Sequence, residues 1–195
     1  MFLVNTLPNI CYVVNPLIQF MTRPLHAHWI IVKHILRYLH GTITLGLRYS
    51  AGDVRLHGYT DVDWVGNVID RKSTYGCCFS LGSTSISWMS KKYKFVALST
   101  TEEEYITTSM ASCEAVWLRK LFGELFEQVL DTKMIYYDNK SGIRLVENLV
   151  FHDKSKHIEI RYYFIQYMVQ RGAVRLRHIS TDEHIADIIT KALPK

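Results

Sequence analysis

Four carboxylates lie where an acidic side chain has little structural use. Asp61 follows an alternating stretch that begins at Val54, in "GYTDVDW", and Asp138 ends the apolar stretch "KMIYYD". Glu104 lies one turn into a segment with helical spacing, and Asp187 lies in the first half of the last such segment. Burying an unpaired carboxylate is costly, so each of these acids either faces solvent or holds a cation.

A divalent metal would account for all four acids together. The first and fourth strands are plausible neighbours in a mixed sheet, so the four acids could converge at one end of it. Converging carboxylates repel one another, and their pKa values rise unless a cation is present. Two Mg²⁺ ions about 3.5–4 Å apart remove this conflict and support in-line phosphoryl transfer. Taken singly, each acid is more often a turn or helix-start residue, so the inference depends on the joint pattern.

The predicted elements follow the order β-β-β-α-β-α-α-β-α, which contains the frame β-β-β-α-β-α-β-α that would position these acids. Alternating or apolar stretches predict strands over 54–61, 75–82, 84–90, 133–138 and 173–180. Ser99 and Glu102 form a capping box at the start of a long helical region, with a break expected near Ser112, and Glu103 is assigned to solvent. A short helix is expected to begin at residue 139. Two further helices are expected over 156–172 and over 181–193, the last with Thr181 as its N-cap.

The first 50 residues differ from the rest. Trp29, Val32, Ile35, Leu36 and Leu39 fall on one face of a predicted amphipathic helix, and a glycine follows it. The four histidines of this region do not make a convincing ligand set on one face. We predict a boundary near residue 50, with a helical segment over 1–50 and an α/β domain over 51–195.

Composition favours a packed domain with a basic balance. The chain has 195 residues, 48% of them hydrophobic, and a formal net charge of +5. A basic balance points weakly to nucleic acid or another anionic surface. The four cysteines include no C-x-x-C pair, so no zinc site is expected, and adjacent Cys77 and Cys78 are predicted to be buried thiols. No run of 18 apolar residues or signal-peptide pattern occurs, so no membrane partner is expected.

Seven motifs, in order along about residues 56–193, resemble the ribonuclease H domain of Ty1/copia-type retrotransposon Pol polyproteins. They are "GYTDVDW", "DRKSTYG", "ISWMSKK", "VALSTTEEEY", "YYDNKSGI", "FHDKSKHIEIRYYFI" and "TDEHIADIITK". Residues 1–50, with "HWIIVKHILRYLHGT", resemble the end of the preceding reverse transcriptase region. The resemblance implies an α/β, RNase H-like fold, with a five-stranded mixed sheet, helices on both faces and an N-terminal helical segment.

The resemblance also implies an activity, which is the two-metal endonucleolytic hydrolysis of the RNA strand of RNA/DNA hybrids. It assigns catalysis and metal binding to Asp61, Glu104, Asp138 and Asp187. The implied cofactor is Mg²⁺, as two ions, with Mn²⁺ as a substitute. Asp63 belongs to the first motif but is not an expected ligand. Among the departures from the family pattern, Glu103 stands where the family usually has a small residue, and His184 stands where it usually has an amide.

Contacts to nucleic acid are expected from two polar stretches and one amide. In "HDKSKHIEIR" the cations lie near a predicted helix start, where they oppose the helix dipole, and a polyanionic partner would explain their presence there. For "DRKST" a solvated loop is an equally good interpretation, and Asn139 is a candidate for a ribose hydroxyl. The candidate nucleic-acid-binding residues are Arg71, Lys72, Ser73, Thr74, Asn139, Lys154, Lys156, His157 and Arg161.

The implied partners are an RNA/DNA hybrid and the reverse transcriptase portion of the parent polyprotein. The implied location is intracellular, in cytoplasmic virus-like particles of an intact element or in the nucleus. No Y-x-D-D polymerase motif is present, so an inactive nucleic-acid-binding or structural remnant of a decayed polyprotein is the alternative. An integrase-type nuclease would require a D-D-E order, whereas here the glutamate precedes two of the aspartates.

Overall fold

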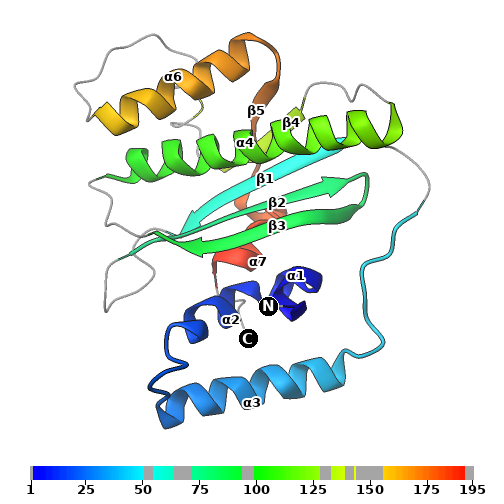
Figure 1. The fold of residues 1–195 in the computed structure, drawn as a ribbon, viewed down its shortest axis with the longest axis vertical. Coiled ribbons are helices and arrows are strands. Elements are labelled where there is room, and N and C mark those ends of the chain that lie inside the picture. Colours follow the sequence, from blue (N-terminus) through cyan, green and yellow to red (C-terminus); the bar gives the residue numbers. More distant parts are fainter. Residues whose placement is uncertain are drawn as a thin grey trace.

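A five-stranded mixed sheet with the strand order β3-β2-β1-β4-β5 forms the centre of the chain (Figure 1). The computed structural model describes residues 2–50, 55–63, 72–93, 99–127, 133–138, 143 and 156–191. The strands are β1 (Leu56–Asp63), β2 (Thr74–Leu81), β3 (Thr84–Lys92), β4 (Lys133–Tyr137) and β5 (Val174–His178). The first three are antiparallel, whereas β4 runs parallel to β1 and to β5. The RNase H-like fold and the pairing of the first and fourth strands are therefore confirmed.

The interior strand β2 is buried along most of its length, because both faces of the sheet are covered. Successive side chains of a strand point to opposite faces. Cys77 and Phe79 therefore pack in one apolar cluster with Ile135, while Cys78 packs in another with Ile189. Both cysteines are buried thiols, as predicted, and burial raises the pKa of Cys77 to about 12.

One face of the sheet is covered by α4 (Thr100–Phe126), with α6 (Lys156–Gln170) beside it (Figure 1). The Ser99 side chain caps α4 by accepting the backbone N–H of Glu102, as predicted. The expected break near Ser112 is wrong, because α4 is one continuous helix. The Ser112 hydroxyl donates to the Thr108 carbonyl oxygen at 2.8 Å, which satisfies this buried polar group inside the helix.

The opposite face is covered by the short helix α7 (Asp187–Thr190) and by the N-terminal segment. That segment comprises α1 (Phe2–Thr6), the 3₁₀ turn η1 (Pro8–Ile10) and α2 (Cys11–Ile18). The Trp88 indole N–H donates to the Val4 carbonyl oxygen at 2.8 Å, and the Asn15 amide donates to the Ser90 carbonyl oxygen at 2.7 Å. The N-terminal helices are thus attached to β3 by specific hydrogen bonds as well as by apolar packing.

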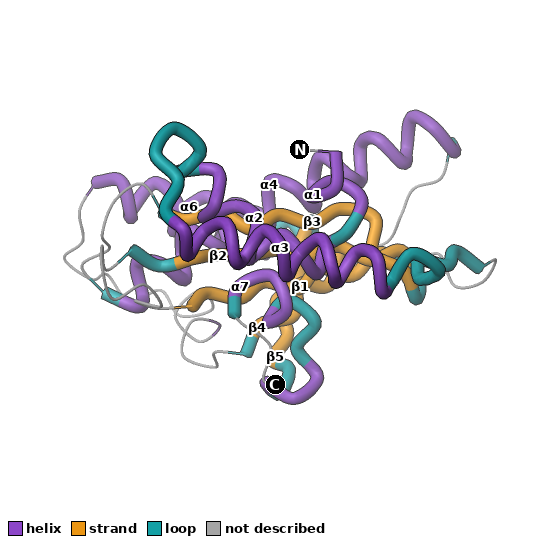
Figure 2. The backbone as a smooth tube through the Cα atoms, turned by 90° about the horizontal axis from the view of Figure 1, so that it is seen from below, coloured by secondary structure: helices purple, strands orange, loops and turns teal. Residues whose placement is uncertain are grey.

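The amphipathic helix predicted in the first 50 residues is α3 (His26–Gly41). In Figure 1 it lies beyond α1 and α2, at the end of the molecule away from the sheet, and in Figure 2, seen from below, it crosses in front of the sheet. None of its residues is buried. The apolar stripe of α3 is therefore only partly covered, with Trp29 and Leu36 exposed.

The helix predicted over 181–193 is interrupted. A 3₁₀ turn, η2 (Thr181–Glu183), is followed by extended backbone at His184 (φ −84°, ψ 98°), and α7 begins only at Asp187. Thr181 is therefore not the cap of this helix, and its N-cap residue is Ala186. Of the helix predicted from residue 139, only Ile143 lies within the described residues, where it is helical. No helix in the described ranges is long and apolar enough to cross a bilayer.

Candidate active site

Asp61 lies within β1, opposite Gly76 of β2, because β1 continues two residues beyond its predicted end. The residue is 2% exposed. Its side chain is directed to the face that α7 covers, where the Thr190 hydroxyl donates to its Oδ2. A buried carboxylate in this position needs compensation from donors or cations.

Asp187 and Lys191 complete an acidic cluster around Asp61. Lys191 Nζ lies 3.3 Å from Asp61 Oδ1, 3.2 Å from Asp61 Oδ2 and 3.2 Å from Asp187 Oδ1. Burial disfavours the charge on Lys191, but Asp61 and Asp187 outweigh this effect and raise its pKa. The ammonium group therefore marks a position between the two carboxylates that favours a cation.

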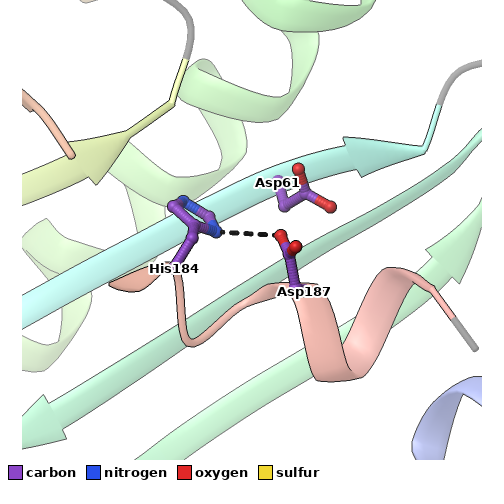
Figure 3. Close-up of side chains that lie close together, drawn as sticks. All are labelled: Asp61, His184 and Asp187. Atoms are coloured by element: carbon purple, nitrogen blue, oxygen red, sulfur yellow. Dashed lines mark ion pairs between the residues drawn. The ribbon is translucent and has the colours of Figure 1, made fainter. Parts of the chain in front are cut away.

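His184 lies close to the same two carboxylates, and Figure 3 shows its ring beside them. One potential ligand atom from each of Asp61, His184 and Asp187 can be chosen so that all three lie within 4.8 Å of one another. The His184 side chain is fully buried, and its Nδ1 lies 3.3 Å from Asp187 Oδ1. The residue comes from the extended stretch between η2 and α7, the interruption that the sequence pattern did not reveal.

Asp138 lies at the same end of the sheet, directly after β4. Tyr136 stacks on Tyr59 with ring centroids 5.0 Å apart, and alternation along the strands places Asp138 on the same face as Asp61. Burial raises the pKa of Asp138, and the charge of Asp61 raises it further, whereas His184 and Lys191 lower it. This is the electrostatic conflict expected of converging carboxylates.

Glu104 projects from the first turns of α4 and is half-buried. Burial raises the pKa of Tyr137 well above its usual value, and the charges of Glu104 and Asp138 add to that rise. The two acids therefore both act on Tyr137, at the end of β4. Glu104 is not part of the cluster formed by Asp61, His184 and Asp187.

Glu103 was predicted to face solvent, and this prediction is wrong. The residue is 2% exposed, and the Ser73 hydroxyl donates to its Oε1 at 2.5 Å. Burial raises the pKa of Glu103, and the hydrogen bond from Ser73 lowers it. The two neighbouring glutamates thus have different environments, since Glu103 is engaged with Ser73 and Glu104 lies near Tyr137.

The predicted nucleic-acid-binding residues are only partly described. Ser73 is buried against Glu103, so the predicted phosphate contact of its hydroxyl does not fit this structure. Thr74 begins β2, while Lys72 and Arg161 are partly exposed. The side chains of Lys156 and His157 lie outside the described part of the chain, as do residues Arg71, Asn139 and Lys154.

The arrangement brings together Asp61, Asp187 and Asp138 from three elements distant in the sequence. Carboxylate oxygens suit a hard divalent cation, and the raised pKa of Asp138 is what such a cation would relieve. The sequence reasoning did not assign His184 to the site. Its signal was a single departure, a histidine where the resembling family usually carries an amide.

Relatives of known sequence match the whole chain. It is 42% identical over 195 residues to the retrovirus-related Pol polyprotein from transposon RE2 of Arabidopsis thaliana, covering 100% of the chain and 13% of that protein. It is 40% identical to the Pol polyprotein from transposon TNT 1-94 of Nicotiana tabacum, covering 99% of the chain and 14% of that protein. The chain thus spans about one seventh of these relatives. No protein-family model matches it.

Solved structures match the fold at low sequence identity. The N-terminal RNase H domain of Rv2228c from Mycobacterium tuberculosis aligns with a TM-score of 0.52 and 15% identity, over 70% of this chain and 91% of that one. The LC11-RNase H1 in complex with RNA/DNA hybrid aligns with a TM-score of 0.50, 13% identity, and 69% and 93% coverage. A foamy viral protease-reverse transcriptase in complex with dsDNA gives a TM-score of 0.60 and 13% identity, over 92% of this chain and 36% of that one.

Proposed function

Because the chain belongs to the Pol polyproteins of copia-type retrotransposons and has an RNase H-like fold, we propose that it is their ribonuclease H. In this proposal it hydrolyses the RNA strand of RNA/DNA hybrids endonucleolytically, with two Mg²⁺ ions or Mn²⁺ in their place. The observation that carries the proposal is the convergence of Asp61, Asp138 and Asp187 at one end of the sheet, where burial, together with the charges of the other two acids, raises the pKa of Asp138.

The donor set fits divalent metal. Asp61 and Asp187 share one cation in the structure, the Lys191 ammonium, at distances of 3.2–3.3 Å. Asp138 and Glu104 supply further carboxylates at the same end of the sheet. Bound divalent ions would activate the attacking water and stabilise the charge that develops on the phosphate.

The residues of the chain then have separate roles. Asp61, held by Thr190 inside the sheet, is a fixed ligand, because a buried strand gives its side chain little freedom. Asp187 comes from the first residue of α7, and Asp138 from the end of β4. We assign the helix acid to Glu104 rather than Glu103, since Glu103 is buried and engaged with Ser73.

The proposed substrate is an RNA/DNA hybrid. One solved protein of this fold was crystallised with such a hybrid, which supports a nucleic-acid partner for the fold. The formal net charge of +5 favours association with a polyanion. Arg161 and Lys72 are the described cations of the predicted binding set, and Asn139 remains a candidate for the ribose hydroxyl.

The proposed protein partner is the reverse transcriptase portion of the same polyprotein. The relatives extend far beyond the matching region, since the chain covers only 13–14% of them. In an intact element the proposed location is intracellular, in cytoplasmic virus-like particles or the nucleus. A polymerase beside this domain would help to hold the hybrid.

The test is the cleavage of a labelled RNA/DNA hybrid by the 195-residue chain in Mg²⁺ and then in Mn²⁺. Asp138→Asn removes one proposed ligand and is expected to reduce cleavage by at least about a hundredfold. Asp182→Asn, which changes an exposed acid of η2, is the matched control and should retain activity. Cleavage by Asp138→Asn at the parental rate would refute the ligand assignment. A folded chain that binds the hybrid without cleaving it would instead be the inactive remnant.

A further inference from the structure

His184 is a buried imidazole at an interruption between two short helical turns. Its side chain is 0% exposed. The edge of its ring faces Tyr59, with centroids 6.3 Å apart and an interplanar angle of 85°. A histidine enclosed in this way normally hydrogen-bonds through at least one ring nitrogen, because an unpaired buried polar atom is costly.

Neither ring nitrogen of His184 has a hydrogen-bond partner among the described residues. Nδ1 lies 3.3 Å from Asp187 Oδ1 (Figure 3), but this contact does not have the geometry of a hydrogen bond. A protonated imidazole paired with Asp187 would account for one nitrogen and leave Nε2 without a partner. A metal ion is the other kind of group that a buried imidazole nitrogen can bind.

The surroundings of the imidazole supply the rest of a coordination set. The potential ligand atoms of Asp61, His184 and Asp187 lie within 4.8 Å of one another. Two carboxylates and one imidazole form a mixed oxygen and nitrogen set, whereas Mg²⁺ prefers oxygen ligands alone. Imidazole ligands instead favour first-row transition metals, whose affinity for nitrogen donors exceeds that of Mg²⁺.

We propose that His184 is a metal ligand together with Asp61 and Asp187, so that this site binds a divalent first-row transition metal, with Mn²⁺ as the probe, in preference to Mg²⁺. The inference deepens the proposed function by naming the metal of its site, and it shares two ligands with it. It separates this chain from a ribonuclease H whose metals are held by carboxylates alone.

Two other side chains contact Asp61 and bear on this site. The Thr190 hydroxyl donates to Asp61 Oδ2, which leaves Oδ1 for a cation. Lys191 Nζ occupies the space between the two carboxylates, but its side chain is 36% exposed. A flexible lysine at this exposure can move to solvent when a metal ion replaces its charge.

The test measures metal binding rather than cleavage. The 195-residue chain is freed of metal and titrated with Mn²⁺, and the free ion is followed by electron paramagnetic resonance, with Mg²⁺ as competitor. Pulsed measurements on the bound Mn²⁺ report any directly coordinated imidazole nitrogen. We expect such a nitrogen signal, and Mn²⁺ binding at least about tenfold tighter than Mg²⁺ binding.

Substitutions then assign the signal. His184→Asn should remove it and weaken Mn²⁺ binding by about tenfold or more, with a much smaller effect on Mg²⁺. His34→Asn, the same change at an exposed position of α3, is the matched control. Circular dichroism checks that each variant is folded.

Two outcomes overturn the inference without need of a variant, namely absence of the nitrogen signal in the parent chain or equal affinity for the two metals. Retention of the signal in folded His184→Asn would also overturn it. Asp61→Asn separates the inference from the proposed function. If that variant loses both metals while the nitrogen signal is absent from the parent, the acidic site stands and only the role of His184 fails. If Asp61→Asn leaves both affinities unchanged, the metal site itself is refuted.

Discussion

Ser73 and Glu103 form a buried polar pair that anchors the first turn of α4. The Ser73 hydroxyl donates to Glu103 Oε1, and the backbone N–H of Tyr93 donates to the Ser73 carbonyl oxygen at 3.0 Å. The Tyr93 hydroxyl donates to the Glu103 carbonyl oxygen at 2.9 Å. These contacts join the start of β2, the end of β3 and the start of α4. Because Glu104 is the next residue, the same network positions the proposed helix ligand.

Ser73→Ala should therefore destabilise the chain. The substitution leaves the buried Glu103 carboxylate without its hydroxyl donor, at a cost of about 1–3 kcal/mol in the free energy of unfolding. Urea denaturation measures this difference. Ser83→Ala, at an exposed turn position, is the matched control and should remain within about 0.5 kcal/mol of the parent. If both variants unfold at the same urea concentration as the parent, the pair has no anchoring role.

For single residues, the sequence indicated which acids to consider, but it did not indicate whether each acid is buried or which side chains it contacts. Asp61, Asp138 and Asp187 were selected as candidates because carboxylates at strand ends and helix starts form a recognisable joint pattern. The burial of Glu103 was not predictable, because it depends on Ser73, which is 30 residues away in the sequence. A single histidine in the sequence gives even less indication of its contacts in the fold. The relation of His184 to Asp61 appears only once α7 is packed against β1.

The packing of α7 against β2 controls the position of Asp187. A Cβ atom at Gly76 would lie 2.7 Å from Thr190 Cγ2 and 2.8 Å from Ile189 Cγ1. Both atoms belong to α7, which is buried at these residues. Glycine at position 76 thus allows α7 to approach the sheet closely enough for Thr190 to reach Asp61.

Gly76→Ala is expected to displace α7 and so to weaken metal binding together with stability. Overpacking of this kind costs about 1–3 kcal/mol in the free energy of unfolding. Displacement of Asp187 and His184 should also reduce the affinity for Mn²⁺, which calorimetric titration measures in the folded variant. Gly46→Ala is the matched control, because no atom lies within 4 Å of a Cβ built there. Full metal affinity in folded Gly76→Ala would show that the site does not depend on this close approach.

Helices and strands could be predicted where the local sequence signals agree with one another. They could not be predicted where tertiary contacts determine the backbone conformation. The strands, the Ser99 cap and α3 follow from alternation, capping chemistry and helical spacing. The continuity of α4 does not, since Ser112 resembles a helix break in sequence but is satisfied by its own helix. The interruption at His184 is likewise a tertiary effect, because extended backbone there brings a buried side chain to Asp61 and Asp187.

At the scale of the whole molecule, an apolar groove lies open between α2 and α3. It has a volume of about 610 Å³ and is lined by residues that include Val14, Leu17, Trp29, Val32 and Leu36. Trp29 is 52% exposed, and α3 has no buried residue. Exposed apolar surface of this extent usually marks a site of association. The reverse transcriptase portion, already proposed as the protein partner, is the occupant that the next experiment tests, because the relatives continue well beyond the matching region.

Trp29→Ala tests this arrangement, and Trp117→Ala provides the matched control. The two tryptophans are equally exposed, at 52% and 53%, but Trp117 lies on α4, away from the groove. The two changes should lower the free energy of unfolding of the chain by similar amounts, since the two side chains are equally exposed. Binding to a separately produced reverse transcriptase portion of the RE2 polyprotein should fall by about tenfold or more for Trp29→Ala alone, because a central aromatic residue often dominates an interface.

Equal binding by both variants, measured by calorimetry, would assign the groove to another occupant. Self-association of the parent chain that Trp29→Ala abolishes would identify that occupant as a second copy.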